Sequence, residues 1–513
     1  MKILSFSADN LAIELSGKYT TPDAIKKKGQ FAYLEGYLGS SQIGAKLMVV
    51  EDQYISKDYL HDFSSYYVYC FENYSKYCKR IHFFRSQFTD EELRRIIVQP
   101  VRSQESFWND YLGFIVVKPI PQSVIGYTLL KHYPSGDEVQ SRNFWGIRNY
   151  HIHIFGNQTE ISSLAFQEQD SIVAACATTA IWTMLSKASN NNYTVLKTPT
   201  DITKDAAEMA SDGGRLFPNK SGLNLAQISK AILKSGMVSE IKGADIPKID
   251  LPDSRPAVVS HHKIKKVLNA YSGIGIPIVF VIRVHNGTKY AGHAITVCGF
   301  TRGPVVAQAV GSRVFVSDNI EKFYAHDDQY GPFVRIEFDS DDSIKTPWSD
   351  KFSQPTHVLS IVVPLYPKIR ISYEDIEVIV LGLHRILALS FSGQVAFGFS
   401  WDIRLDYSEN YKAAVKETTL TDSEKIKILT RSLPRYVWIA RCYCGEHVLL
   451  DFVFDATDIH RGMFGLSAVC YVPELKQYLR EHLSDNKFLF SRLLDHHASS
   501  HYYDFIISEL RDV

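Results

Sequence analysis

The sequence predicts an α+β protein built from several domains. Strand-like apolar runs and capped helices are mixed along the 513 residues, and the stretch 255–340 is especially rich in strands. A chain of this length exceeds one ordinary hydrophobic core, so two to four domains are expected. We place them at 1–150, 151–364 and 365–513, with α/β or α+β architecture in both flanking regions.

The composition argues against a polyanionic partner. Hydrophobic residues make up 45% of the chain and charged residues 22%, which is typical of soluble globular proteins. The 56 basic and 56 acidic residues cancel, so bulk charge favours neither nucleic acid nor an anionic membrane surface. We therefore expect no nucleic-acid partner and no membrane association.

The termini and cysteines indicate a compartment. The first residues lack the apolar run of a signal peptide, and no stretch approaches the roughly 20 apolar residues that span a bilayer. The seven cysteines are odd in number and have no framework spacing, which suits reduced thiols. These patterns predict a cytoplasmic protein.

The first region combines strands with helices. AKLMVVEDQYI and YLGFIVVKPIP are expected strands, and Thr89 is expected to cap a helix that begins with TDEE. The many aromatic residues either fill a core, which is the simpler interpretation, or form a partner-binding surface. Cys70 and Cys78 lie eight apart on an expected helix. They indicate packing rather than metal binding, because no further ligand pair is near.

Two other groups of possible metal ligands are incomplete. His151 and His153 alternate along an expected strand, so they share a face but lack a third ligand. Cys442, Cys444 and His447 lie where two expected strands meet, which favours a β-hairpin over a zinc site. We expect no metal and no cofactor.

The remaining elements follow from hydrophobic period and capping. Helices are expected at TDITKDAAEMA, LNLAQISKAILKSGM, KIKKVLNAY, IEVIVLGLHRILALSF and TDSEKIKILTRSL. Strands are expected at PIVFVIRV, YAGHAITVCGF, RVFVSDN, KFYAHDD, VRIEF and VAFGFSWDIRL. Two of these strands, RVFVSDN and KFYAHDD, end in acidic residues.

The segment QEQDSIVAACATTAIWTML organises the functional prediction. Asp170 or Ser171 is expected to cap a helix, and Cys176 then lies in its first turns. The partial positive charge of a helix N-terminus favours a thiolate there. An upstream glutamine could help to bind an oxyanion.

A nucleophilic cysteine also needs a base and a group that orients the base. His293 follows Gly292 on an expected strand, and the glycine lets other backbone approach without a side chain in the way. A carboxylate at the end of a later strand completes the set. Taken singly, Cys176 and His293 could each be ordinary buried residues; their order and context together favour chemistry.

This order of residues resembles the papain-like cysteine peptidase fold, over about residues 160–340, and is most similar to the branch of the bacteriocin-processing peptidases. The resemblance implies a helix that carries the cysteine and packs on an antiparallel sheet that carries histidine and aspartate. It makes Cys176 the nucleophile and His293 the general base and acid. It makes Asp327 the orienting residue, with Asp318 and Asp328 as rivals.

The resemblance is inexact at the oxyanion site. The family has a glutamine about six residues before the cysteine, whereas Gln169 lies seven before Cys176 and Gln167 nine before it. Ala177 follows the cysteine where the family has glycine. We prefer Gln169 as the oxyanion donor.

Three functions are compatible with these residues. The leading one is an intracellular cysteine peptidase that acts on a peptide or protein substrate through an acyl-enzyme thioester. The same residues would also serve a deamidase, transglutaminase or acyltransferase, because a thioester can be resolved by water or an amine. The third is a non-enzymatic protein that uses this core as a scaffold and binds a protein partner through its flanking domains.

Overall fold

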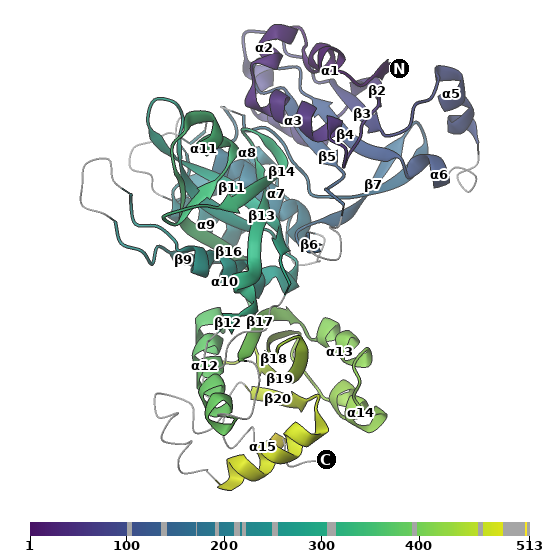
Figure 1. The fold of residues 1–513 in the computed structure, drawn as a ribbon. Coiled ribbons are helices and arrows are strands. Elements are labelled where there is room, and N and C mark those ends of the chain that lie inside the picture. Colours follow the sequence, from purple (N-terminus) through teal and green to yellow (C-terminus); the bar gives the residue numbers. More distant parts are fainter. Residues whose placement is uncertain are drawn as a thin grey trace.

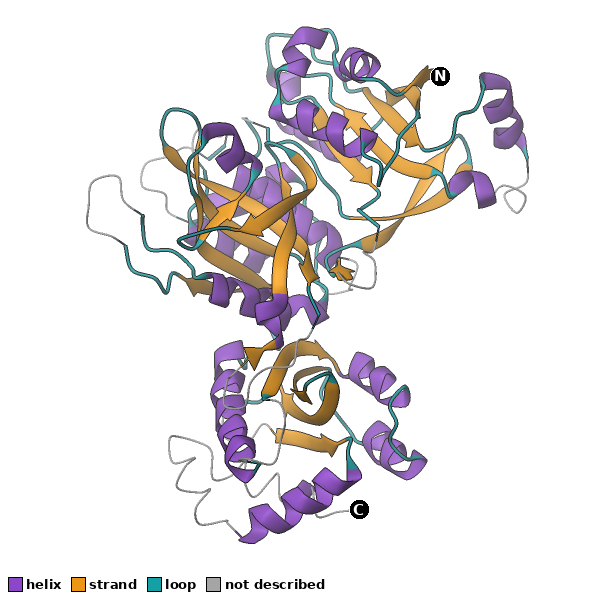
Figure 2. Cartoon of the chain, in the orientation of Figure 1, coloured by secondary structure: helices purple, strands orange, loops and turns teal. Residues whose placement is uncertain are grey.

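A computed structural model gives the arrangement of the chain. It describes residues 1–99, 105–134, 141–170, 172–189, 194–209, 216–217, 222–248, 255–304, 314–391, 398–459, 465–485 and 508–509. Figure 1 shows three parts, with the N-terminal and C-terminal parts on opposite sides of a central one. Helices and strands are mixed in each part (Figure 2), which confirms the α+β prediction.

The N-terminal part is a five-stranded antiparallel sheet with helices. The sheet has the order β1-β2-β3-β4-β5. Its strands are β1 (Lys2–Ser5), β2 (Leu47–Tyr54), β3 (Cys78–Phe84), β4 (Tyr111–Val117) and β5 (Ile125–Leu130). Its helices are α1 (Ala8–Leu15), α2 (Pro22–Lys26), α3 (Gly29–Gly39), α4 (Lys57–Ser65), α5 (Asp90–Val98) and α6 (Glu105–Trp108), with a 3₁₀ turn η1 (Tyr67–Tyr69).

Local signals in this part are confirmed with one exception. Thr89 caps α5 in a reciprocal capping box with Glu92, as the sequence predicts. The prediction that Cys70 and Cys78 share a helix is wrong. Cys70 follows η1, and Cys78 begins β3, because the aromatic segment leaves the helix after Ser65.

The central part contains an eight-stranded sheet whose strand pairs are all antiparallel. Its path is β10-β11-β13-β14-β15-β16-β9, and β16 also pairs with β10, so the sheet closes on itself. These strands are β9 (Val238–Gly243), β10 (Ile278–His285), β11 (Tyr290–Arg302), β13 (Ile320–Asp327), β14 (Gly331–Phe338), β15 (Ser343–Lys345) and β16 (Thr356–Leu365), with β6 (Ser141–Asn143) beside β11.

Helices surround this sheet, and a separate hairpin precedes it. The helices are α7 (Cys176–Ala188), α8 (Pro199–Ala207), α9 (Leu225–Lys234), α10 (His261–Tyr271) and α11 (Pro347–Phe352), with the 3₁₀ turn η3 (Ser272–Ile274), and the hairpin is β7 (Arg148–Ile154) with β8 (Asn157–Ser163). The expected strand RVFVSDN is wrong in part. Only β12 (Val314–Phe315) is extended, and a 3₁₀ turn η4 (Val316–Asn319) follows.

The C-terminal part has its own sheet, with the order β12-β17-β18-β19-β20. Strand β12 pairs in parallel with β17, so a segment from the middle of the chain completes this sheet. Its other elements are β17 (Phe399–Tyr407), β18 (Tyr436–Cys444), β19 (His447–Asp455), β20 (Gly465–Cys470), α12 (Tyr373–Ser390), α13 (Ser408–Lys416), α14 (Asp422–Thr430) and α15 (Pro473–Asp485). Cys444 pairs with His447 across the β18–β19 hairpin, which confirms that prediction.

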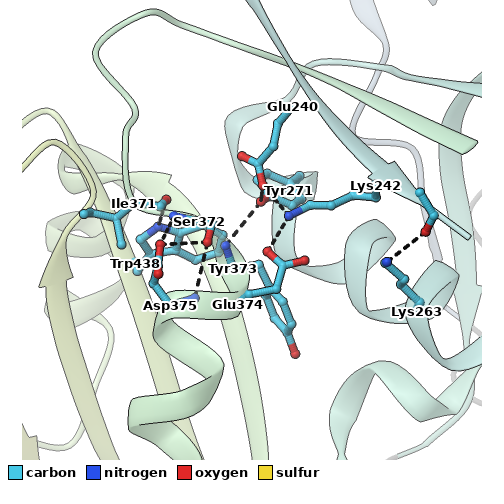
Figure 3. A network of polar contacts seen from close by, with 11 residues as sticks. Glu240, Lys242, Lys263, Tyr271, Ile371, Ser372, Tyr373, Glu374, Asp375 and Trp438 are labelled. Atoms are coloured by element: carbon cyan, nitrogen blue, oxygen red, sulfur yellow. Dashed lines mark hydrogen bonds and ion pairs between the residues drawn. The ribbon is translucent and has the colours of Figure 1, made fainter. Parts of the chain in front are cut away.

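Polar contacts join the central and C-terminal parts (Figure 3). The Lys242 ammonium on β9 is buried between the carboxylates of Glu240 and Glu374, and Glu374 is the second residue of α12. The Tyr271 hydroxyl donates to Glu240 Oε1 over 3.0 Å and accepts the Tyr373 backbone N–H over 3.3 Å. These contacts fix the start of α12 against β9 and α10.

The N-terminal part packs on one face of the central sheet. Along β13, Phe323 and Ala325 belong to the core that includes α7, whereas Tyr324 belongs to the core of the N-terminal part. A Cβ added at Gly331 would come within 2.2 Å of the Tyr33 ring on α3, so glycine permits this close approach. The Tyr33 hydroxyl also donates to the Pro332 carbonyl over 2.7 Å. The α3 helix therefore lies directly against the β13–β14 turn.

Within the described part of the chain, we find no helix with the length and apolar character needed to cross a membrane.

Candidate functional site

Cys176 is the first residue of α7, at the helix end where backbone N–H groups have no intrahelical partners. The residue before the helix is Ala175, which makes no side-chain capping bond. The expected cap at Asp170 is therefore wrong, and Ser171 lies outside the described residues. Cys176 is partly exposed, whereas the residues after it are buried.

Asp170 is held by the N-terminal part instead of capping α7. Its Oδ1 accepts the Ile172 backbone N–H over 2.9 Å. Its Oδ2 accepts the Tyr67 hydroxyl and lies 3.8 Å from the Lys118 ammonium. The segment before Asp170 also pairs with β5, since Thr128 and Phe166 exchange two backbone hydrogen bonds. The N-terminal sheet thus sets the path of the chain into the cysteine.

Helix α7 packs on β11, the strand that carries His293. Ile181, Trp182 and Leu185 are fully buried on this helix. The Thr296 hydroxyl on β11 donates to the Ala180 carbonyl over 2.9 Å. This buried hydrogen bond fixes the helix start relative to the histidine.

His293 is buried on β11, with 6% of its surface exposed. Its Nε2 lies 2.9 Å from Asp327 Oδ1 in a hydrogen bond. Gly292 beside it is exposed, and a Cβ added there would meet no atom within 4 Å. The backbone at Gly292 therefore has free space beside it, whereas the His293 ring is enclosed by protein.

The protonated form of His293 is strongly favoured. Burial opposes protonation, but the charge and hydrogen bond of Asp327 more than offset it. A side-chain hydrogen bond with Cys176 and the charge of Asp328 act in the same direction, so the pKa of His293 lies well above its usual value. The site thus favours His293 as an imidazolium.

Asp327 is the last residue of β13, and two further donors fix its carboxylate. The Gln329 backbone N–H donates to Oδ1 over 3.0 Å, and the Trp348 indole N–H donates to Oδ2 over 2.9 Å. The Trp348 ring also packs edge-on to His293, with centroids 5.3 Å apart. Sequence reasoning missed Trp348; its only signal was a tryptophan just inside a helix that Thr346 caps.

Asp328 is a second buried carboxylate at the same turn. Its Oδ1 lies 3.5 Å from His293 Nε2, yet neither of its oxygens makes a hydrogen bond among the described residues. Burial raises its pKa to about 7; His293 opposes this shift, and Asp327 and Glu168 add to it. Its backbone carbonyl accepts the Gln30 amide N–H over 3.1 Å. Gln30, on α3, is another residue that the sequence did not reveal.

The structure places Asp318 elsewhere. This residue lies in η4, where its Oδ1 is 2.9 Å from His262 Nδ1 and its backbone carbonyl accepts the Lys265 ammonium. Burial opposes its ionisation, but His262 and Lys265 hold the pKa of Asp318 below its usual value. Of the three candidate aspartates, Asp327 and Asp328 are thus the ones beside His293.

The two candidate glutamines have different surroundings. Gln167 is 5% exposed, and its amide nitrogen has no hydrogen-bond partner among the described residues. Gln169 is partly exposed and lines a cleft together with Gln329. A buried, unpartnered N–H donor is the kind of group that an oxyanion would satisfy. The choice of Gln169 over Gln167 stays a prediction.

The side chains of His293, Asp327 and Asp328 could also form a metal site. His293, Asp327 and Asp328 each offer one ligand atom, all within 4.8 Å of one another, and no other such group occurs among the described residues. However, Asp327 already accepts N–H bonds from Gln329 and Trp348. A carboxylate with such donors on both oxygens is better suited to orient an imidazole than to bind a cation.

His151 and His153, the two histidines of the β7 strand, are exposed, and His151 lies beside an acidic residue. His151 and His153 are both exposed on β7, as the alternating pattern predicts. His151 Nδ1 lies 2.9 Å from Glu160 Oε1 on the paired strand.

No protein-family model matches this chain, and the comparison with curated proteins gives no significant match.

Proposed function

We propose that this chain is a thiol hydrolase, most simply a cysteine peptidase, with Cys176 as nucleophile, His293 as base and Asp327 as the group that orients the base. One observation carries the proposal. The buried His293 ring is hydrogen-bonded to Asp327 through Nε2 and also interacts with the thiol of Cys176 at the start of α7. A nucleophile, a base and an orienting carboxylate in contact are the parts that acyl transfer requires.

The wider arrangement supports the papain-like resemblance. The helix that begins with Cys176 packs against β11, the strand of His293, and Asp327 ends the neighbouring antiparallel strand β13. These are the relative positions that the resemblance implies. Fold similarity alone would not assign an activity, so the proposal depends on the site.

The reaction follows from the contacts of His293. The Cys176 thiolate adds to the carbonyl carbon of an amide, and the carbonyl oxygen becomes an oxyanion. When this intermediate collapses, the C–N bond breaks and the His293 imidazolium gives its proton to the leaving nitrogen, which leaves a thioester on Cys176. His293 then takes a proton from water as the water oxygen attacks the thioester; the C–S bond breaks, the acid product leaves, and the thiolate and imidazolium are regenerated.

The oxyanion has two sources of N–H donors nearby in the chain. The uncapped start of α7 offers backbone N–H groups and the positive end of the helix dipole. A glutamine amide, from Gln169 or Gln167, is the second donor. Donors of this type typically contribute about 3 kcal/mol to the transition state.

Thiol reactivity tests the proposal without a known substrate. We expect iodoacetamide to label Cys176 faster at neutral pH than Cys70 and Cys444, which are also partly exposed, and the labelled residue is identified by peptide mass spectrometry. His293→Ala should slow the labelling of Cys176 by about tenfold or more, because the imidazolium no longer favours the thiolate. His285→Ala, on the adjacent strand β10, is the matched control and should leave the rate unchanged.

The outcome that contradicts the proposal is equal labelling of the three partly exposed cysteines. If Cys176 is reactive, incubation with a peptide mixture and an added amine separates the chemistries. Hydrolysis products indicate a peptidase, whereas amine adducts of the acyl group indicate an acyltransferase. Cys176→Ala should abolish either product and leave the thermal unfolding transition in place.

A further inference from the structure

A cleft of about 710 Å³ lies between the N-terminal part and the central part. It is next to the turn between β13 and β14, which contains Asp327 and Asp328. One wall comes from the α2–α3 region, including Ala24 and Lys28. Another comes from the turn that contains Gln122. The central part contributes Gln169 and Gln329. The cleft thus joins segments that are far apart in the sequence.

The described lining of the cleft mixes polar and apolar surface and has no uncompensated charge. Among the described residues that line it, only Lys28 and Glu168 carry charge, and they form an ion pair with each other. Glu168 is also satisfied by the Ile125 backbone N–H over 3.2 Å and the Gln30 amide over 3.3 Å. A ligand would therefore meet the amides of Gln122, Gln169 and Gln329 rather than a free ion.

The backbone of Gln122 is strained at the rim of this cleft. Its φ is +68°, in the left-handed region that non-glycine residues rarely adopt. Its carbonyl accepts the Lys28 ammonium, and Ser123 N–H donates to the Pro121 carbonyl over 2.9 Å. Strain of this kind persists where surrounding contacts enforce it, and it is often found at binding sites.

Two residues of the cleft lining donate hydrogen bonds to Asp327 and Asp328, the aspartates beside His293. Gln329, which lines it, donates its backbone N–H to Asp327 Oδ1, and Gln30, which also lines it, donates to the Asp328 carbonyl. Gln169 belongs to the segment that leads into Cys176. Anything bound in the cleft would touch residues adjacent to both carboxylates.

We propose that this cleft binds an extended, uncharged stretch of the substrate polypeptide. Primary amides both donate and accept hydrogen bonds, as peptide groups do, so a wall of glutamines complements an extended main chain. A phosphate or nucleic acid is disfavoured because Lys28 is already paired. The choice of peptide over a neutral sugar rests on the proposed function, since a thiol hydrolase acts on amides.

The test uses the full chain with Cys176→Ala, so that bound peptide is not consumed. The probe is a fluorescein-labelled mixture of peptides about ten residues long, made of Gly, Ser, Asn and Ala, and binding is read by fluorescence anisotropy. Ala24→Trp, which fills the cleft from its rim, should weaken binding by about tenfold or more. Lys27→Trp, an exposed change on the same segment that does not line the cleft, should alter it by less than about twofold.

A second variant guards against a folding defect. Gln122→Gly removes an amide from the cleft and relieves the left-handed backbone, so it should weaken binding while the protein melts no lower than wild type. Both tryptophan variants are checked by thermal unfolding in the same way. Weaker binding without lower stability is not expected from a merely structural role.

Several results would overturn the cleft assignment. These are a Kd of the parent protein above about 1 mM for the neutral peptides, unchanged binding in Ala24→Trp and Gln122→Gly, tighter binding of Lys- and Glu-rich peptides, or displacement by maltoheptaose. Failure of the proposed function has a different signature. In that case Cys176 is unreactive toward iodoacetamide in the wild-type chain, whether or not the cleft binds peptide.

Discussion

Trp348 and Asp327 are joined by a hydrogen bond in which the indole N–H donates to carboxylate Oδ2 over 2.9 Å. The other oxygen of the same carboxylate faces His293 Nε2. The indole ring also packs edge-on to that imidazole. One side chain on the short helix α11 therefore helps to fix the carboxylate and also packs against the imidazole that the carboxylate faces.

Trp348→Phe tests this positioning role. The substitution keeps an aromatic ring against His293 but removes the donor to Asp327 Oδ2, so only the contacts at Oδ1 still hold the carboxylate. We expect the iodoacetamide rate of Cys176 at neutral pH to fall by about three- to tenfold, in line with the net contribution of one ordinary hydrogen bond, since the contacts at Oδ1 remain. The control is Tyr330→Phe, which keeps the ring against Trp348 and removes a hydroxyl that contacts Pro347. Equal rates in both variants would contradict the role of the indole.

Asp328→Asn tests the second carboxylate through stability. Burial raises the pKa of Asp328 from 3.8 to about 7, so the folded state holds this proton more tightly than the unfolded state does. The fold therefore loses stability as pH rises from about 4 through 7, because the buried group must ionise. Asn cannot ionise, so we expect Asp328→Asn to be more stable than wild type at pH 8, by on the order of 1 kcal/mol or more, and to lose this advantage at pH 4.

Urea unfolding at the two pH values measures this difference. Asp318→Asn is the matched control, because the pKa of Asp318 is lowered by His262 despite its burial. Its stabilising effect is present at neutral pH and is lost in acid, so Asp318→Asn should destabilise the chain at pH 8. A pH-independent difference between Asp328→Asn and wild type would contradict the account of Asp328.

The buried His326 should have the opposite effect to Asp328, because it lowers the stability of the fold as the pH falls. It lies between the rings of Phe166 and Phe333, and its ring nitrogens lack hydrogen-bond partners among the described residues. Burial lowers the pKa of His326 to about 3. The unfolded chain thus binds the proton first, and stability falls as pH drops from about 6.5 toward 3.

His326→Phe should remove this loss. Between pH 7 and pH 5, we expect wild type to lose about 2 kcal/mol more of unfolding free energy than the variant, since pH 5 lies 1.5 units below the unfolded pKa. Phe166→Leu in the same cluster is the control, and it should lower stability equally at both pH values. Parallel pH profiles for wild type and His326→Phe would show that burial of this ring does not control its protonation.

Local signals explain why part of this site was predictable. The period of the apolar residues after Cys176 and the strand around His293 depend on near neighbours, so the sequence placed both residues in the correct elements. Thr89 and Glu92, three residues apart, likewise form the expected cap. Interactions within one turn of chain can be read from residue types and spacing.

Long-range contacts decided the rest. Asp170 does not cap α7, because Tyr67 and Lys118 of the N-terminal part bind its carboxylate. Trp348 is 21 residues from Asp327, and Gln30 is 298 residues from the Asp328 carbonyl that it contacts. No period or spacing in a single sequence records such pairs, and the addition of β12 to the C-terminal sheet has the same cause.

The junction in Figure 3 supplies the last prediction. The Lys242 side chain is 6% exposed, and its ammonium lies between the carboxylates of Glu240 and Glu374. Lys242→Met would leave both carboxylates without their cation, and because Glu240 and Glu374 are partly exposed, we expect the free energy of unfolding to fall by about 1 to 2 kcal/mol. Lys263→Met, which removes only a bond to the Gly243 carbonyl, should cost less than about 1 kcal/mol.

The location of this effect is as informative as its size. Lys242 lies at the junction with α12, whereas Cys176 lies on the helix that packs against β11. Hydrogen exchange should therefore increase in the first turns of α12 in Lys242→Met, while the iodoacetamide rate of Cys176 stays at the wild-type value. A large fall in thiol reactivity would mean that the C-terminal part also controls the geometry of Cys176 and His293. It would contradict the expectation that the Lys242 junction and the Cys176 site are independent.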